Sequence, residues 1–206
     1  MKKILVTQRL ESIKAYGEVR DQLDVAWHKL LAEAGYLCVP FPSHVEIQPF
    51  IEAIKPDGLI LSGGNDLAAL NDNLLNRKRD QVETELLNTF KSKNLPVLGV
   101  CRGAQFIAHQ FGAELEKVDG HVTCSHELEV LEGNILTPLL KCNKVNSYHN
   151  FAITSLKAPL IPTAICSDKT IEAFEHQTLP IYGILWHPER GETESTSFSI
   201  LQMIFG

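Results

Sequence analysis

The sequence predicts an α/β fold, in which a mostly parallel sheet is flanked by helices and carries a small antiparallel extension. Over the first hundred residues, short apolar runs alternate with amphipathic stretches, which is the pattern of βα units. After Phe111-Gly112 the apolar runs become shorter and more closely spaced, which favours antiparallel strands. A chain of 206 residues can bury a sizeable core, and we expect a single domain over residues 1–206.

The elements of the parallel part follow from apolar spacing. Buried strands are indicated by unbroken apolar runs, and helices by apolar residues three and four apart, as at Leu23, Trp27 and Leu30. Gly35 lies where the first helix would end. The expected strands are 3–7, 37–41, 58–62 and 96–100, and the expected helices are 18–34, 47–54 and 79–93.

The antiparallel part is expected to extend the sheet or to flank it. Its alternating runs predict strands at 126–131, 141–145, 164–167 and 171–175, the last two joined by a turn at Asp168-Lys169. The stretch 194–205 is expected to close the fold as a helix.

Charge and composition argue against several kinds of partner. Phosphate contacts need clustered Lys and Arg, so a formal net charge of -6 disfavours a general nucleic-acid or acidic-membrane binder. The amino-terminal apolar run turns polar at Thr7-Gln8-Arg9, too soon for a signal peptide, and no apolar run approaches bilayer length. We therefore expect a cytoplasmic protein with no nucleic-acid and no membrane partner.

The cysteines do not have the arrangement of a disulfide framework. There are five of them, widely spaced, in a chain without an export signal. Cys38, Cys142 and Cys166 lie within apolar runs and are expected in the core. His121, Cys124 and His126 offer three irregularly spaced metal ligands, fewer than a structural zinc site uses, so we predict no metal and no cofactor.

Cys101 has a different setting, between an apolar strand and a helical run. Gly99 and Gly103 flank it two residues away on each side, which is the Gly-x-nucleophile-x-Gly elbow. The sharp turn crowds the backbone, so small residues must flank it, while the nucleophile projects above the sheet edge. The helix N-terminus favours the thiolate over the thiol, and Arg102 adds positive charge. We predict a nucleophile here, the alternative being a buried core cysteine.

His187 is the best candidate for the base that such a nucleophile needs. It lies in Trp186-His187-Pro188-Glu189, after an apolar run. Residues two apart in an extended backbone point the same way, so Glu189 can accept a hydrogen bond from the imidazole and fix its tautomer. A His-x-Glu pair alone could be a surface pair, and the interpretation depends on the elbow upstream.

Two groups of amides could stabilise the oxyanion that forms when a thiolate attacks a carbonyl. One is the amide of Arg102, directly after the nucleophile, and the other belongs to the Gly63-Gly64 turn after strand 58–62. We prefer Gly64 within that turn. The alternative for Gly63-Gly64 is an ordinary tight turn.

Together these motifs resemble the class I glutamine amidotransferase superfamily, and within it the free-standing γ-glutamyl hydrolases of the peptidase C26 type. The resemblance covers nearly the whole chain and depends on five motifs in family order: Ser62-Gly63-Gly64-Asn65-Asp66, Arg79-Asp80 with Glu83, Gly99-Val100-Cys101-Arg102-Gly103-Ala104-Gln105, Val145-Asn146-Ser147-Tyr148-His149-Asn150 and Trp186-His187-Pro188-Glu189. It implies a flavodoxin-like fold, a triad of Cys101, His187 and Glu189, and an oxyanion hole at Gly64 and Arg102. The substrate-binding residues it implies are Gly63, Gln105, Ser147, Tyr148, His149 and Asn150.

The resemblance also implies hydrolysis of a γ-glutamyl amide through a thioester. Glutaminases of the superfamily usually carry Cys-Leu-Gly, so Cys101-Arg102-Gly103 favours hydrolysis over ammonia supply. The stretch 16–24 and the short chain differ from γ-glutamyl-aminobutyrate hydrolases and resemble the branch of γ-glutamyl-CDP-amidate hydrolases, which free cytidine diphosphoramidate for capsule decoration.

An anionic nucleotide would need cationic neighbours. The candidates are Arg9, Arg20, Arg77 and Arg79, each of which could instead be solvated surface charge. Three other functions remain open: a glutaminase subunit that passes ammonia to a synthase partner, an aminobutyrate-type hydrolase, and a non-enzymatic thiol sensor in which Cys101 oxidises.

Overall fold

The computed structural model describes residues 1–131, 144–190 and 194–206, with side chains of the last range from residue 197 on. The helices are α1 (Val25–Glu33), α2 (Ile47–Ile54), α3 (Leu74–Ser92), α4 (Arg102–Gln110) and α5 (Glu194–Phe205), with a short 3-10 helix η1 (Pro188–Arg190). The strands of the main sheet are β1 (Lys3–Val6), β4 (Leu37–Pro40), β5 (Gly58–Leu61), β6 (Val97–Val100), β7 (Glu114–Lys117), β8 (Val122–Val130), β9 (Lys144–Tyr148), β10 (Phe151–Ser155), β11 (Leu160–Cys166), β12 (Ile171–His176) and β13 (Ile181–Ile184). A separate hairpin consists of β2 (Arg9–Ile13) and β3 (Glu18–Gln22).

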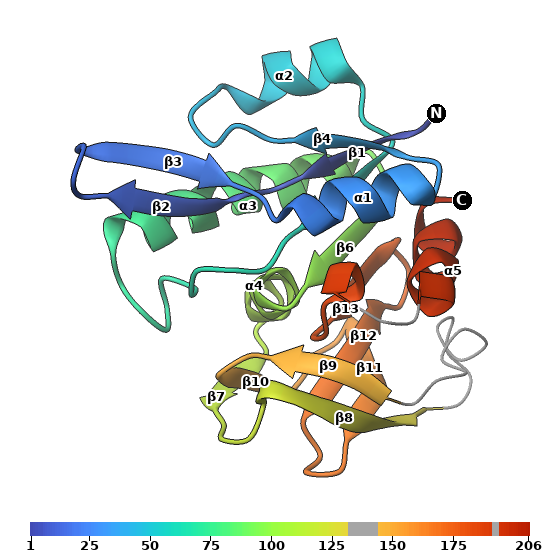
Figure 1. Cartoon of the computed structure of the whole chain (residues 1–206). Helices are drawn as coiled ribbons and strands as arrows, with labels where there is room; N and C mark the ends of the chain where they lie inside the picture. The colour runs from blue at the N-terminus through green and yellow to red at the C-terminus, as the bar shows by residue number, and fades with distance from the viewer. Residues whose placement is uncertain (132–143, 191–193) are drawn as a thin grey trace.

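The main sheet has a parallel part and an antiparallel part, as the sequence predicts. Its order is β4-β1-β5-β6-β13-β12-β11-β8-β9, with β10 pairing with β12 and β7. Strands β4 to β13 are parallel, and β13 to β9 are antiparallel. Figure 1 shows the parallel strands and helices in one half of the molecule and the antiparallel strands in the other.

Alternation along the parallel strands divides the core between the two faces of the sheet. Leu5 and Leu59 pack with residues of α2, α3 and α4, whereas Ile4 and Ile60 pack with residues of α1 and α5. This two-residue period explains why these strands are apolar throughout, since both faces are covered. The helices thereby hold the carboxyl ends of β1, β5, β6 and β13 in place, and the loops that follow these ends build the site.

Most predicted elements are confirmed, but the helix predicted over 18–34 is wrong in its first part. Residues Glu18–Gln22 form β3 and pair with β2 around a turn that contains Gly17 at φ +64°. The helix begins only at Val25, where the Asp24 side chain accepts a hydrogen bond from the amide of Ala26. Strand β3 is mostly exposed, so it has no apolar periodicity to distinguish it from a helical turn. The resulting hairpin projects from the body of the molecule (Figure 1).

Other element boundaries differ from the predicted ones. Helix α3 begins at Leu74 rather than at 79, because Asn73 caps it by accepting from the amides of Leu75 and Asn76. Strands β7 and β10 were not predicted, and β8 starts at Val122 rather than at 126. Part of the strand predicted over 141–145 lies outside the described residues.

Of the cysteines expected in the core, Cys166 is buried and Cys38 is half-buried against core residues. Both thiols are free, as are those of Cys101 and Cys124, whereas Cys142 lies outside the described residues. Burial raises the pKa of the Cys38 thiol to about 11. Among the helices of the described ranges, none combines the length and the apolar character that crossing a bilayer requires.

Candidate active site

The strand-to-helix turn predicted at Cys101 is present between β6 and α4. Cys101 has φ 52° and ψ −109°, a conformation that L residues rarely adopt, and its amide donates to the carbonyl of Ile184 at 2.8 Å. A Cβ at Gly103 would lie 1.9 Å from the carbonyl oxygen of Leu61, and one at Gly99 would lie 2.7 Å from the amide of Ala104. Side chains at either position would therefore displace the backbone, so the turn requires both glycines.

The structure brings Cys101, His187 and Glu189 together. His187 follows β13, and its Nδ1 lies 2.7 Å from Glu189 Oε1. Burial alone would lower the pKa of His187, but its hydrogen bonds to Cys101 and Glu189 outweigh that effect and raise the pKa to about 9. The predicted contact is present, although its backbone is not extended as expected. Glu189 lies in η1, where Arg190 N donates to His187 O at 3.1 Å, and this turn brings Glu189 back to the imidazole.

Asn146, to which the sequence assigned no role, holds the backbone of His187. His187 N donates to Asn146 Oδ1 at 2.8 Å, and Asn146 Nδ2 donates to His187 O at 2.9 Å. Strand β9 thus fixes the peptide that carries the base, although the two residues are 41 positions apart. Nothing in the local pattern around Asn146 could have indicated this pairing.

The Gly63-Gly64 turn lies against the triad, because a Cβ at Gly63 would lie 2.8 Å from His187 Cε1 and 3.6 Å from Cys101 Cβ. Arg79 holds this turn from behind. Its Nη1 donates to the carbonyls of Gly63, at 3.1 Å, and Gly64, and its Nη2 donates to Ser62 O at 2.7 Å. In a trans peptide the N–H points opposite to the C=O, so the Gly64 amide is directed away from Arg79, as an oxyanion donor would need.

The prediction of Arg79 as an anion-binding residue is therefore wrong. Its side chain is 2% exposed, and its guanidinium nitrogens already donate to protein oxygens. Arg102 is also buried, and its guanidinium pairs with Glu83 and Asp80. These carboxylates compensate the charge that Arg102 was expected to add beside Cys101. Its amide remains the first of α4, where backbone N–H groups lack intrahelical partners.

The predicted glutamyl-binding segment places only part of itself at the triad. The Tyr148 ring lies 5.7 Å from the His187 ring between centroids. Ser147 is instead buried and donates to His121 O at 2.7 Å, and His149 is buried against Glu172. Their side chains are therefore not available to a substrate, contrary to expectation, and this part of the segment would have to bind it through its backbone.

The remaining members of the predicted substrate-binding set lie at the edges of this segment. Gln105 is buried, and its Nε2 donates to Phe151 O at 2.7 Å, which ties α4 to the start of β10. Asn150 is exposed, and its carbonyl accepts from the amide of Val118 at 3.0 Å. The structure thus gives Gln105 a bracing contact beside the segment and leaves the Asn150 side chain at the surface.

A cleft of about 560 Å³ opens beside His187, between the β2–β3 hairpin, the start of α1 and the Ser62–Gly64 turn. Two arginines line it, Arg9 and Arg190. The Arg9 guanidinium donates to Gln22 Oε1 at 3.2 Å, and Arg190 lies over the Tyr148 ring, 5.2 Å from its centroid. Sequence analysis missed Arg190, although it directly follows the Trp-His-Pro-Glu motif.

The other two arginines predicted to bind an anion lie outside the residues that line this cleft. Arg20 is exposed on β3 and pairs with Glu18, and Arg77 is exposed on α3 and pairs with Asp72. Only Arg9 of the four predicted cations therefore reaches the cleft. Charge in a sequence does not indicate where a side chain points.

Comparison with known proteins agrees with this geometry. The family model Peptidase C26 matches residues 4–189. A γ-glutamyl-CDP-amidate hydrolase of Campylobacter jejuni subsp. jejuni serotype O:2 is 35% identical over 188 residues, covering 90% of this chain and 88% of that protein. The glutamine-hydrolysing component of a GMP synthase of Thermococcus kodakarensis is 31% identical over 145 residues, covering 70% and 72%.

Solved structures agree on the fold. A Thermoplasma acidophilum protein assigned as a GMP synthase component superposes with a TM-score of 0.76 at 23% identity, over 100% of this chain and 93% of that one. A glutamine amidotransferase of Thermotoga maritima gives a TM-score of 0.69 at 15% identity, over 98% and 82%. The predicted glutamine amidotransferase fold is thus confirmed. Because the family model spans β1 through the His187–Glu189 pair, the chain belongs to the peptidase C26 family.

Proposed function

We propose that this protein hydrolyses γ-glutamyl amides, with Cys101 as the nucleophile and His187 as its acid and base. The observation that carries the proposal is the hydrogen-bonded series from Cys101 through His187 to Glu189, built on a backbone turn that only flanking glycines permit. A thiol sensor would need neither the histidine nor the carboxylate, so this series favours catalysis.

The proposed reaction has two steps. The Cys101 thiolate attacks the γ-carbonyl carbon, and the amides of Gly64 and Arg102 stabilise the oxyanion. The His187 imidazolium gives its proton to the leaving nitrogen as the C–N bond breaks, which leaves a glutamyl thioester. Neutral His187 then takes a proton from water, whose oxygen attacks the thioester, and the C–S bond breaks to release glutamate and the thiolate.

The pH dependence of this reaction should reveal the proton on His187. Since hydrogen bonds raise the pKa of His187 to about 9, kcat/KM for a γ-glutamyl amide should fall as pH rises through about 9, where the proton donor is lost. Glu189 is one of the groups that raise this pKa, so Glu189→Gln should shift the alkaline limb toward the ordinary histidine value. A pH–rate profile of both proteins checks this.

Glu52→Gln makes the same chemical change on the exposed face of α2 and serves as the control, with the limb expected to stay near 9. An alkaline limb that remains in place in Glu189→Gln would contradict the assigned role of Glu189.

We further propose that the leaving group is a nucleotide amidate, the substrate class named for the Campylobacter jejuni relative, which would release cytidine diphosphoramidate for capsule modification. Arg9 and Arg190 support this, because they line the cleft beside His187 and could pair with phosphate oxygens. Glutamate release should be measured from a γ-glutamyl nucleotide amidate, from γ-glutamyl-aminobutyrate and from glutamine, and the nucleotide amidate should be preferred.

Arg190→Ala should lower kcat/KM for the nucleotide amidate by about 10-fold or more relative to glutamine, the loss expected for a charge-assisted hydrogen bond. The ratio of the two substrates is the readout, because Arg190 also lies 3.6 Å from Glu189 and can affect both reactions. Arg77→Ala, outside the cleft, should leave the ratio unchanged. Equal losses for both substrates in Arg190→Ala would exclude a phosphate contact at this residue.

A second candidate function is a glutaminase that delivers ammonia to a synthase partner. The GMP synthase relatives favour it, because their name describes a glutamine-hydrolysing component of a synthase. Glutamine would then be the preferred substrate, and its turnover would rise when a synthase partner is added. A nucleotide amidate preferred over glutamine in the isolated chain would count against this alternative.

A further inference from the structure

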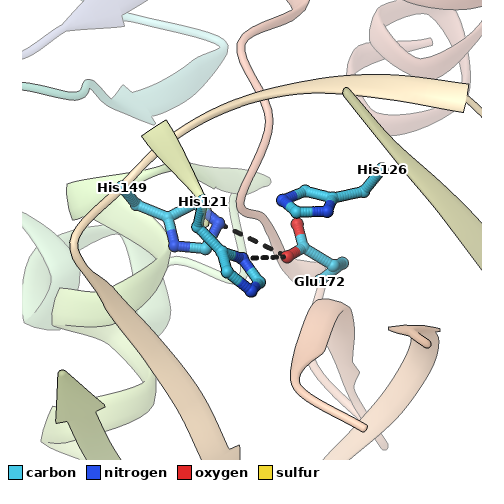
Figure 2. Close-up of side chains that lie close together, drawn as sticks. All are labelled: His121, His126, His149 and Glu172. Atoms are coloured by element: carbon cyan, nitrogen blue, oxygen red, sulfur yellow. Dashed lines mark ion pairs between the residues drawn. The ribbon is translucent and has the colours of Figure 1, made fainter. Parts of the chain in front are cut away.

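Four side chains that are distant in sequence meet behind the predicted glutamyl-binding segment. His121 precedes β8, His126 lies on β8, His149 lies in the turn between β9 and β10, and Glu172 lies on β12. One potential ligand atom from each lies within 4.8 Å of the others. Figure 2 shows the three imidazoles gathered around the Glu172 carboxylate.

Hydrogen bonds at the far side of two rings orient them toward this carboxylate. His121 Nε2 lies 2.8 Å from Asp168 Oδ2, and its Nδ1 lies 3.7 Å from Glu172 Oε1. His149 Nδ1 lies 3.1 Å from Phe151 O, and its Nε2 lies 3.3 Å from Glu172 Oε1. A ring N–H donated to a carboxylate or a carbonyl leaves the other nitrogen with a free lone pair, which is how metal-binding histidines are held.

The atoms that face one another lack hydrogen-bond partners. Within the described ranges, none is found for His121 Nδ1, His149 Nε2 or either carboxylate oxygen of Glu172. Glu172 is 0% exposed, and His121 and His149 are each 3% exposed. Burying such groups unpaired is costly, and lone pairs that face lone pairs repel one another. A cation between them would satisfy all four atoms at once.

We propose that His121, His126, His149 and Glu172 bind a divalent transition metal, with Zn²⁺ as the ion that three imidazoles and one carboxylate suit best. Tetrahedral zinc with bonds of about 2.0–2.2 Å holds its ligand atoms about 3.4 Å apart. The distances from Glu172 Oε1 to the nitrogens of His121 and His149, 3.7 and 3.3 Å, are already close to this. Four protein ligands fill the coordination shell, so the site is structural.

The sequence alone disfavoured a metal because it offered only His121, Cys124 and His126. Folding adds His149 and Glu172, whereas the Cys124 thiol donates to Gly120 O at 2.9 Å. The ion would join three segments of the antiparallel part: β8, the β9–β10 turn and β12. It would not enter the cleft that is lined by His187, Arg9 and Arg190.

The metal would brace the active site from behind. His149 is adjacent to Tyr148, whose ring lies against His187, and its amide donates to His121 O at 3.0 Å. On the other side, Glu172 O accepts from the amide of Leu185 at 2.8 Å, two residues before the proposed base. The ion would therefore fix both the segment beside the substrate and the strand that carries His187. Metal binding itself does not depend on the proposed function.

Metal content and binding test the proposal directly. Untagged protein should be stripped with a chelator, dialysed, and titrated with Zn²⁺ by calorimetry and by competition with a chromophoric chelator. We expect one Zn²⁺ per chain with a Kd below about 100 nM, and a higher melting temperature in the loaded protein. Co²⁺ in place of Zn²⁺ should give the visible absorption bands of a tetrahedral site.

Two variants remove ligands, and two controls locate the ion. His126→Ala and Glu172→Gln should lose the high-affinity Zn²⁺, whereas His28→Ala, an exposed histidine on α1, should keep it. Cys101→Ala should also keep it, which separates this site from zinc captured by Cys101 and His187. A wild-type protein that binds no Zn²⁺ below about 10 μM would overturn the proposal, as would an ion that is lost in Cys101→Ala.

The wild-type stoichiometry and the Cys101→Ala result decide the matter even if a ligand variant fails to fold. Glutamate release is measured separately, so a failed hydrolase assay with intact zinc binding would affect only the proposed function. The reverse result would affect only the metal site.

Discussion

Replacing Cys101 with alanine should lower kcat for γ-glutamyl amide hydrolysis by about 10⁴-fold or more, the loss expected when a nucleophile is removed. Without the thiolate no thioester forms, and what remains is the catalysis that the oxyanion donors supply to direct attack by water. The fold should persist, because alanine fits the space of the thiol. Glutamate release, together with circular dichroism of the variant, measures both effects.

Cys38→Ala is the matched control, because Cys38 is also a free and largely covered cysteine but lies on β4, outside the site. It should retain wild-type turnover. Mass spectrometry of the wild-type enzyme, quenched during turnover, should detect a glutamyl adduct on Cys101. Wild-type turnover in Cys101→Ala would refute nucleophilic catalysis by this residue, whereas an unlabelled but active wild type would refute the accumulation of a thioester.

The parts of the site that the sequence could predict are those encoded within a few residues. The elbow depends on Gly99 and Gly103, whose need for a missing side chain is set by contacts at the turn itself. The His187–Glu189 pair spans a single intervening residue, so its proximity follows for either an extended or a 3-10 backbone. Local spacing was sufficient in both cases.

Other parts depend on tertiary contacts that no local pattern specifies. The clamp by Asn146 needs β9 to lie beside the segment after β13, and the histidine cluster needs β12 to bring Glu172 under the β9–β10 turn. The β2–β3 hairpin was mistaken for helix because its exposed strands have no buried face to set a period. Among the arginines, charge indicated a function, but only the fold shows that Arg79 lies inside and Arg9 in the cleft.

The buried network that surrounds Glu83 connects stability to the geometry of the site. Its Oε1 accepts from Thr7 Oγ1 at 2.8 Å and from Arg79 Nε at 3.0 Å, and its Oε2 accepts from Arg102. Glu83 therefore anchors both the arginine that holds the Gly63-Gly64 turn and the one that follows Cys101. The whole group lies within the core, where charges need their partners.

Glu83→Gln should lower the free energy of unfolding by about 3–5 kcal/mol, the cost of leaving buried charges uncompensated. Glutamine has nearly the same shape, but it removes the negative charge between two guanidinium groups and places amide hydrogens opposite their donors. Urea unfolding at neutral pH measures the loss. Because a typical domain is stable by only about 5–15 kcal/mol, the variant should also melt well below the wild type.

Glu85→Gln, two positions along the same helix but exposed, is the matched control, and its stability should change by no more than about 0.5 kcal/mol. In the folded fraction of Glu83→Gln, the Arg79 side chain is no longer held by a carboxylate, so the Gly64 amide should lose its alignment and kcat should fall more than KM changes. Wild-type stability in Glu83→Gln would mean that the arginines find other partners. Wild-type kcat in a destabilised variant would instead separate the network from the oxyanion turn, because the turn would then be held by its own backbone.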